Sequence, residues 1–215
     1  MGEAEMGFLK GSVTCTRFQV PADLPEGFRE TVRERISRYA FRKLEEDSDQ
    51  ERTLGWVNIA DELQVGFSGD EMFKEPYLAL AVRLDVRTVP ARALRQYCRE
   101  AEEEVKTLEG LDFLNKKRRE EIRERVRKQL MRRVLPRTST YDMAWDLQSG
   151  VVLFGSTTSR TCDAFSELFF NTFELRLTSL YPYALAYSML QDRGMDPAAL
   201  DEVQPAVLAG EGSTS

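Results

Sequence analysis

Two long helical patterns occupy the middle of the chain, and segments with β patterns lie on either side of them. The first pattern runs from Pro90 to Leu108, and the second runs from Asn115 to Val134 with apolar residues four positions apart. Gly110 separates the two patterns, and Pro136 ends the second. Two long helices joined by a short break predict a helical hairpin that can project from the body of the protein.

The flanking segments predict a sheet. Residues 77–86 are strongly apolar, residues 140–147 alternate between apolar and polar side chains, and residues 151–154 form a return strand after a turn at 148–150. Further strands are expected at residues 8–20, 54–59 and 175–177, and further helices at 28–44, 165–172 and 183–190. The predicted fold class is therefore α+β, with small β-sheet layers packed with helices, plus the long helical hairpin.

These patterns divide the chain into four parts. They are an N-terminal α/β part of the core (1–88), the long basic hairpin (89–136), a C-terminal β-hairpin and helix part of the core (137–192), and a tail (193–215). The tail is rich in Gly, Ala, Pro and Ser, and we expect it to be disordered.

The charge of the chain is unevenly distributed. The segment from Lys116 to Arg137 contains eleven Lys or Arg residues and three Glu, a local charge of +8 in a chain whose formal net charge is −6. The remaining residues therefore carry −14 together. Such an asymmetry indicates a localised electropositive surface on an acidic body.

The basic segment is the strongest functional signal, because phosphate binding needs several cations spaced along a charged backbone. The predicted DNA-binding residues are Lys116, Lys117, Arg118, Arg119, Arg123, Arg127, Lys128, Arg132, Arg133 and Arg137. The alternative is a solvated helix with internal Glu–Arg pairs, although three Glu cannot neutralise eleven cations. On a helical wheel the cations occupy nearly all faces, and no base-reading motif is present, so any DNA contact should be independent of sequence.

The absence of histidine restricts catalysis more than any other feature. It removes the usual general base at neutral pH and the Ser–His and Cys–His nucleophile pairs, while carboxylate-bound magnesium, lysine and tyrosine chemistry stay open. The carboxylates that could hold magnesium are Asp61, Glu62, Asp70, Asp142 and Asp146, and they form no recognisable metal-nuclease motif. We therefore interpret them as surface residues and predict no catalytic residue, metal site or cofactor.

The aromatic residues are of two kinds. Phe169, Phe170 and Phe173 could stack on unpaired bases, but their helical spacing favours core packing. Trp56 and Trp145 lie in strand patterns and are expected in the core as well.

The three cysteines, Cys15, Cys98 and Cys162, are far apart and form no CxxC pair, so we interpret each as a small buried hydrophobic residue. No apolar run approaches the roughly 20 residues that span a bilayer. The acidic N-terminus also lacks the apolar core of a signal peptide. The expected location is the cytoplasm, away from membranes.

Several stretches, in this order and spacing, resemble the RdgC family of bacterial recombination-associated proteins. They are Gly55-Trp56-Val57, the strand end at Val89-Pro90, the segment from Leu135 to Trp145, and the hairpin and helix from Ser149 to Phe169. The likeness extends over roughly residues 8–190. It implies a DNA-binding protein without strong sequence preference, a ring-shaped dimer around duplex DNA, and restraint of the RecA recombinase.

The resemblance also leaves alternatives open. Family members are longer, with a further C-terminal domain, so an open clamp or a different oligomer could replace the closed ring. The leading interpretation is a nucleoid-associated, sequence-independent DNA-binding protein that regulates RecA-type homologous recombination as a homo-oligomer, most simply a dimer. A magnesium-dependent exonuclease and a protein-interaction module acting on a recombination factor are the alternatives.

Overall fold

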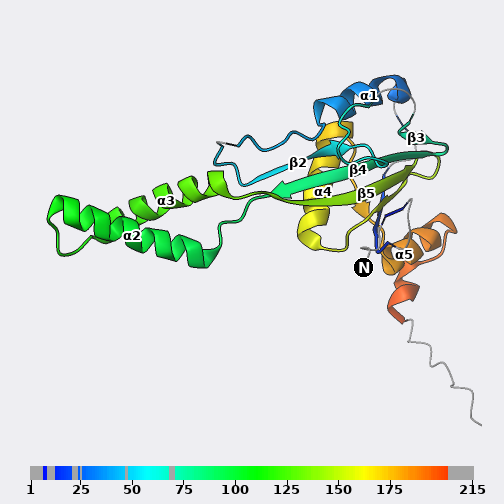
Figure 1. The fold of residues 1–215 in the computed structure, drawn as a ribbon. Helices are drawn as coiled ribbons and strands as arrows, with labels where there is room; N and C mark the ends of the chain where they lie inside the picture. Colours follow the sequence, from blue (N-terminus) through cyan, green and yellow to red (C-terminus); the bar gives the residue numbers. More distant parts are fainter. Residues whose placement is uncertain are drawn as a thin grey trace, which may run out of the picture.

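A computed structural model describes residues 7–8, 13–20, 24, 26–46, 48–67 and 71–202. It has a body built around one antiparallel sheet, from which a helical hairpin projects (Figure 1). The strands are β1 (Thr16–Gln19), β2 (Arg52–Val57), β3 (Phe73–Lys74), β4 (Tyr77–Val86), β5 (Arg137–Asp146), β6 (Val151–Phe154) and β7 (Thr178–Ser179). The helices are α1 (Phe28–Arg38), α2 (Ala91–Glu109), α3 (Lys116–Arg133), α4 (Ser159–Phe173), α5 (Pro182–Asp192) and the 3-10 helix η1 (Pro197–Glu202). The predicted α+β class and the projecting hairpin are confirmed.

The strand order in the sheet is β2-β4-β5-β6-β1-β7, with the short β3 paired to β4. Its central ladder joins β4 and β5 along their whole length, from the pair Tyr77–Asp146 to the pair Val86–Arg137. Because α2 follows β4 and α3 precedes β5, the hairpin is an excursion between two paired strands (Figure 1). Both of its ends are therefore anchored at one end of the central ladder.

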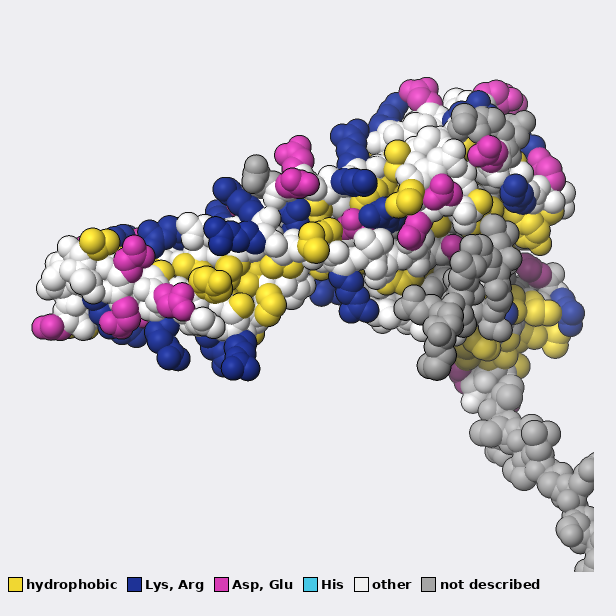
Figure 2. Space-filling model, viewed as in Figure 1, with side chains coloured by type: hydrophobic (Ala, Val, Ile, Leu, Met, Phe, Trp, Pro, Cys, Tyr) yellow, Lys and Arg dark blue, Asp and Glu magenta, His cyan; other side chains and the backbone are white. Residues whose placement is uncertain are grey.

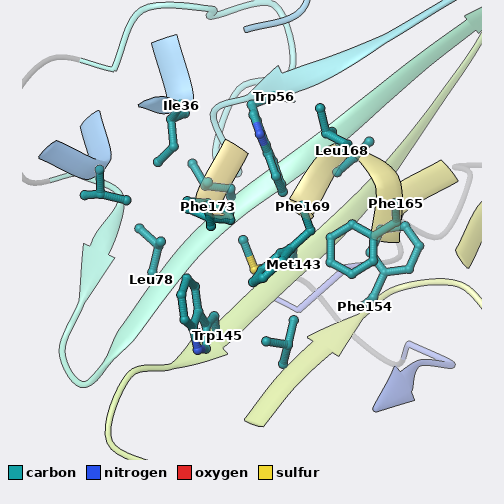
Figure 3. Packing of buried hydrophobic residues seen from close by; sticks show 14 of the residues in the cluster. Ile36, Trp56, Leu78, Met143, Trp145, Phe154, Phe165, Leu168, Phe169 and Phe173 are labelled. Carbon is teal, nitrogen blue, oxygen red and sulfur yellow. The ribbon is translucent and has the colours of Figure 1, made fainter. Parts of the chain in front are cut away.

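The main core lies between the sheet and the helices α1 and α4 (Figure 3). Trp56, Trp145, Phe165 and Phe169 are all fully buried there, so both tryptophans are core residues as predicted. Figure 3 shows the rings of Phe154 and Phe165 face to face, and their centroids are 3.9 Å apart. Burying each such aromatic side chain removes on the order of 150–250 Å² from water, which makes this cluster the main stabilising feature of the body.

The hairpin has a small core of its own. Its buried residues are Val105, Leu114, Ile122 and Val126, with Leu94, Cys98, Ala101 and Leu130 packed against them. Capping residues next to each helix determine where α2 ends and where α3 begins. Gly110 closes α2 in the left-handed conformation, and the Asn115 side chain accepts a hydrogen bond from the Arg118 amide (2.8 Å) to cap α3.

One predicted helix is shorter than expected. The pattern predicted a helix from Phe28 to Leu44, but α1 ends at Arg38. The chain then runs beside β2, where Phe41 donates a backbone hydrogen bond to Trp56 and the Trp56 amide donates to Tyr39. Gly55 permits this approach, because a Cβ at that position would lie 2.5 Å from the Phe41 Cα. Pairing with a strand has replaced the last helical turns.

Other corrections concern the two ends of the chain. The strand expected at 175–177 forms instead at Thr178–Ser179, where it pairs with β1. The 3-10 helix Pro197–Glu202 lies in the tail expected to be disordered, and residues 203–215 are outside the described part of the chain. Of the strand expected at 8–20, β1 covers Thr16–Gln19, and residues 9–12 are likewise not described.

Candidate nucleic-acid interface

The hairpin places most of the predicted cations on its surface. Nine of the ten predicted DNA-binding side chains are exposed, and Arg127 is half-buried. Arg137 differs from the other nine because it is the first residue of β5 and not part of the helix. Figure 2 shows basic side chains along both long edges of the hairpin, with an apolar stripe between them and acidic side chains near the tip.

A groove of about 650 Å³ lies between α2 and α3 on one flank of the line where the two helices meet. We call it the basic groove. Its lining residues are Ala91, Leu94, Arg95, Cys98, Arg99, Glu102, Lys116, Arg119, Glu120 and Arg123. Five cations and two carboxylates line this groove, and its floor includes apolar side chains that belong to the hairpin core.

Sequence reasoning missed the contribution of α2. Arg95 and Arg99 line the basic groove, and Arg92 joins them in an adjoining surface hollow. The three arginines are three and four positions apart, which places them on one face of a helix. Lys116, Arg119 and Arg123 have the same spacing in α3. This repeated spacing was the available signal, but the higher charge density of α3 obscured it.

The opposite flank of the hairpin has a different character. A second groove of about 500 Å³, which we call the mixed groove, is lined there by residues of both helices. Its charged residues are Arg132 and Arg133 from α3 and Glu100 and Glu104 from α2. Two predicted DNA-binding residues therefore lie away from the basic groove, among an equal number of carboxylates.

Three further cations of α3 are engaged in ion pairs. Arg118 binds Glu109 (2.7 Å) and Glu121 (3.3 Å) at the tip of the hairpin, and the hydrogen bond that Arg118 donates to Glu109 is the main cause of its raised pKa. Arg127 pairs with Glu51, and Lys128 pairs with Asp49 at 3.7 Å; all three also face a glutamate of α3 itself. The partners Glu51, Asp49 and Glu109 lie outside α3, so the helical wheel could not show this neutralisation.

The acidic segment of residues 45–46 and 48–51, here the acidic loop, is held in place by Arg87. Arg87 is buried, and its guanidinium donates to the carbonyl oxygens of Ser48 (2.9 Å) and Glu45 (3.1 Å). Its backbone amide donates to the Glu51 carbonyl (2.7 Å). The hydrogen bonds of Arg87 therefore hold the loop in place. Asp49 and Glu51 of this loop form ion pairs with α3 close to the body.

The carboxylates considered for magnesium have structural roles. Asp142 accepts a hydrogen bond from the Phe8 amide (2.7 Å), and Glu62 accepts one from Thr140. Asp146 accepts hydrogen bonds at the β5–β6 turn, where the Ser149 hydroxyl is the main cause of its lowered pKa. Asp61 accepts from the Leu63 amide (2.9 Å), whereas Asp70 lies outside the described residues. Within the described ranges, no group of three or more Cys, Asp or Glu residues could hold a metal ion.

The remaining candidates follow the sequence interpretation in part. Phe169 and Phe173 are buried as predicted, whereas Phe170 is 42% exposed and lies 5.4 Å from the Arg176 guanidinium. The cysteines are free, and they are only half-buried where the sequence predicted buried residues. Burial raises the pKa of the Cys98 thiol, partly offset by Arg123.

None of the helices described is long and apolar enough to cross a membrane.

Comparison with known protein families shows a match over most of the chain. The family model described as "Putative exonuclease, RdgC" matches residues 14–189, a segment that begins before β1 and extends into α5. No curated protein matches the sequence significantly. The matched segment includes the whole hairpin together with the sheet strands that anchor it.

Proposed function

The chain belongs to the RdgC family, and on that premise we propose that it binds DNA without reading the base sequence. The observation that carries the proposal is the basic groove, where cations from α2 and α3 gather on one exposed flank of the hairpin. Phosphate contacts carry no sequence information, and the hairpin offers cations without a base-reading motif.

The wider role is proposed from the family resemblance. The protein would act as a regulator of RecA-type homologous recombination, working on duplex DNA in the cytoplasm at the nucleoid. Its partners would be DNA, a second copy of the chain in a dimer, and a RecA-type recombinase. An acidic body suits this role, because it limits non-specific attraction of DNA to surfaces other than the hairpin.

A second candidate function is exonuclease activity, which the description of the matching family favours. We place it second because the chain has no histidine. In addition, three carboxylates that could hold magnesium, Asp61, Asp142 and Asp146, accept hydrogen bonds that cap turns or hold the chain.

DNA binding is tested by charge reversal at the hairpin. Replacing four cations by Glu should abolish binding to duplex DNA, since each phosphate contact contributes about −0.9 to the slope of log affinity against log salt. The changes are Lys116→Glu, Lys117→Glu, Arg119→Glu and Arg123→Glu. The fold should survive, because Ile122 and Val126 remain buried against α2 and exposed charges contribute little to stability.

The matched control reverses four exposed cations of the body and so changes the net charge equally. Its substitutions are Arg17→Glu, Lys43→Glu, Lys74→Glu and Arg160→Glu. Fluorescence anisotropy with unrelated duplexes at several salt concentrations gives the affinity and its slope, and circular-dichroism melts check folding. If the folded hairpin variant binds with the wild-type slope, or if the body variant loses as much affinity, the hairpin is not the DNA-binding surface.

A further inference from the structure

We infer that the basic groove holds the sugar–phosphate backbone of one nucleic-acid strand, which crosses obliquely from the base of α2 to the outer end of α3. This inference rests on the proposed DNA-binding function and names the path that the DNA takes on the hairpin. It concerns six cations, of which three are on each helix. They are Arg92, Arg95 and Arg99 of α2 and Lys116, Arg119 and Arg123 of α3.

The two sets of cations form one continuous track. Arg119 lies 4.0 Å from Glu102, and Arg123 lines the groove together with Cys98 and its neighbour Arg99. Arg123 is therefore level with the last arginine of the α2 set, and the α3 set continues from there toward the tip. At a rise of about 1.5 Å per residue each set covers about 10 Å, so the track is about 20 Å long. Successive phosphates of a strand advance by about 3.4 Å along a duplex, so about six nucleotides match the track.

The change of helix follows the charge of α2. Beyond Arg99, α2 carries five glutamates, at positions 100, 102, 103, 104 and 109, and its only cation there is Lys106. A polyanion that follows the arginines of α2 would meet repulsion if it stayed on that helix. The three α3 cations of the track reach this level at Arg123 and continue toward the tip, so the favourable path crosses the groove.

The groove also has a suitable floor. Leu94 and Cys98 belong to the apolar core of the hairpin, and burial raises the pKa of the Cys98 thiol, which keeps it neutral. A neutral, weakly polar floor suits deoxyribose rings, whereas the phosphates require the cations of the two rims. Two carboxylates, Glu102 and Glu120, oppose a strand here because they line the groove, and Glu102 also pairs with Arg119.

The first test removes two charges from each flank of the hairpin. Arg95→Gln with Arg99→Gln removes the two α2 cations that line the basic groove. Arg132→Gln with Arg133→Gln is the matched control and removes two cations from the mixed groove. The net charge changes by the same amount in both variants. The first variant should weaken DNA binding about tenfold and lower the salt slope by about 2, since each lost phosphate contact removes about 0.9. The affinity of the control variant for DNA should stay within about twofold of the wild-type affinity.

The second test uses a variant that is expected to bind DNA more tightly, a result that misfolding cannot produce. Glu102→Gln removes one of the two carboxylates of the basic groove, and Glu104→Gln, on the same helix, removes one of the two carboxylates of the mixed groove. A carboxylate about 4 Å from a phosphate in water opposes it by an energy equivalent to about a fivefold change in affinity. Glu102→Gln should therefore bind DNA about fivefold more tightly at low salt, whereas Glu104→Gln should bind as the wild type does.

Both tests use full-length protein with a single-stranded and a duplex oligonucleotide of the same length. If the groove variants change only the duplex affinity, one strand of a duplex occupies the groove, and if they change only the single-strand affinity, a free strand does. Equal effects of the basic-groove and mixed-groove variants would overturn the inference while leaving DNA binding intact. Failure of the wild-type protein to bind either oligonucleotide at low salt would instead contradict the proposed function itself.

Discussion

At the scale of single residues, a buried hydrogen bond lies inside the aromatic core of the body and contributes to its stability. The indole N–H of Trp56 donates to the Thr172 hydroxyl oxygen (2.8 Å), and both residues are buried. The hydroxyl in turn donates to the Leu168 carbonyl, which is the usual back-bond within a helix. The hydroxyl thus satisfies a tryptophan N–H that has no access to water.

Thr172→Val should lower the free energy of unfolding by about 1–3 kcal/mol, because it keeps the shape of the side chain and leaves the Trp56 N–H buried without an acceptor. Chemical denaturation measures this change. In a Trp56→Phe background, which has no N–H to satisfy, the same substitution should be close to neutral. An equal cost in both backgrounds would show that the hydrogen bond is not the source of the stability.

At the scale of elements, the acidic loop and α3 are joined by ion pairs that would compete with the proposed binding of DNA. Glu51 pairs with the half-buried Arg127, and Asp49 pairs with the exposed Lys128, both close to the base of the hairpin. Exposed ion pairs contribute only about 0–1 kcal/mol each, so phosphates can replace these carboxylates at small cost. The loop is therefore an internal counter-charge for two cations of α3.

The combined variant Asp49→Asn and Glu51→Gln should bind DNA more tightly, by a few-fold to about tenfold at low salt, because two cations lose their carboxylate partners. Raising the salt concentration should shrink the gain. The control is Glu45→Gln with Glu46→Gln, which removes two charges from the same loop and leaves the two ion pairs intact. A gain of equal size in the control would mean that net charge, and not release of Arg127 and Lys128, determines the affinity.

At the scale of the whole molecule, the distribution of charge favours binding over catalysis. The basic hairpin projects from the body, and the described carboxylates that could hold magnesium, Asp61, Glu62, Asp142 and Asp146, belong to the sheet and its loops. A nuclease would need its metal and its scissile phosphate at one place. The proposed DNA track and these four described carboxylates lie on different parts of the fold.

Purified protein should therefore leave labelled duplex and single-stranded DNA intact in the presence of Mg²⁺ or Mn²⁺, under conditions where it binds them. Gel analysis over hours, with a catalytic amount of a known exonuclease as the positive control, measures this. Metal-dependent degradation that is lost in Asp142→Asn or Asp146→Asn, but kept in the hairpin variants, would establish the exonuclease alternative.

The sequence by itself determined the elements whose signals are local. Strands β4 and β6 begin and end where the apolar patterns predicted, and both hairpin helices lie within a residue or two of their predicted ends. Proline, glycine and an asparagine cap mark those helix ends, and each acts on its immediate neighbours. The excess of cations on α3 was equally plain, since counting charges needs no fold.

Only the tertiary structure decided which of those cations share a surface. Arg95 and Arg99 join Arg119 and Arg123 because the hairpin folds α2 against α3. Likewise, Arg127 finds its partner in Glu51, 76 positions earlier in the chain. The early end of α1 has the same origin, because hydrogen bonds to a strand outweighed a helical repeat. Periodicity reports the contacts that a residue makes within its own element, whereas these outcomes depend on contacts between elements that are distant in sequence.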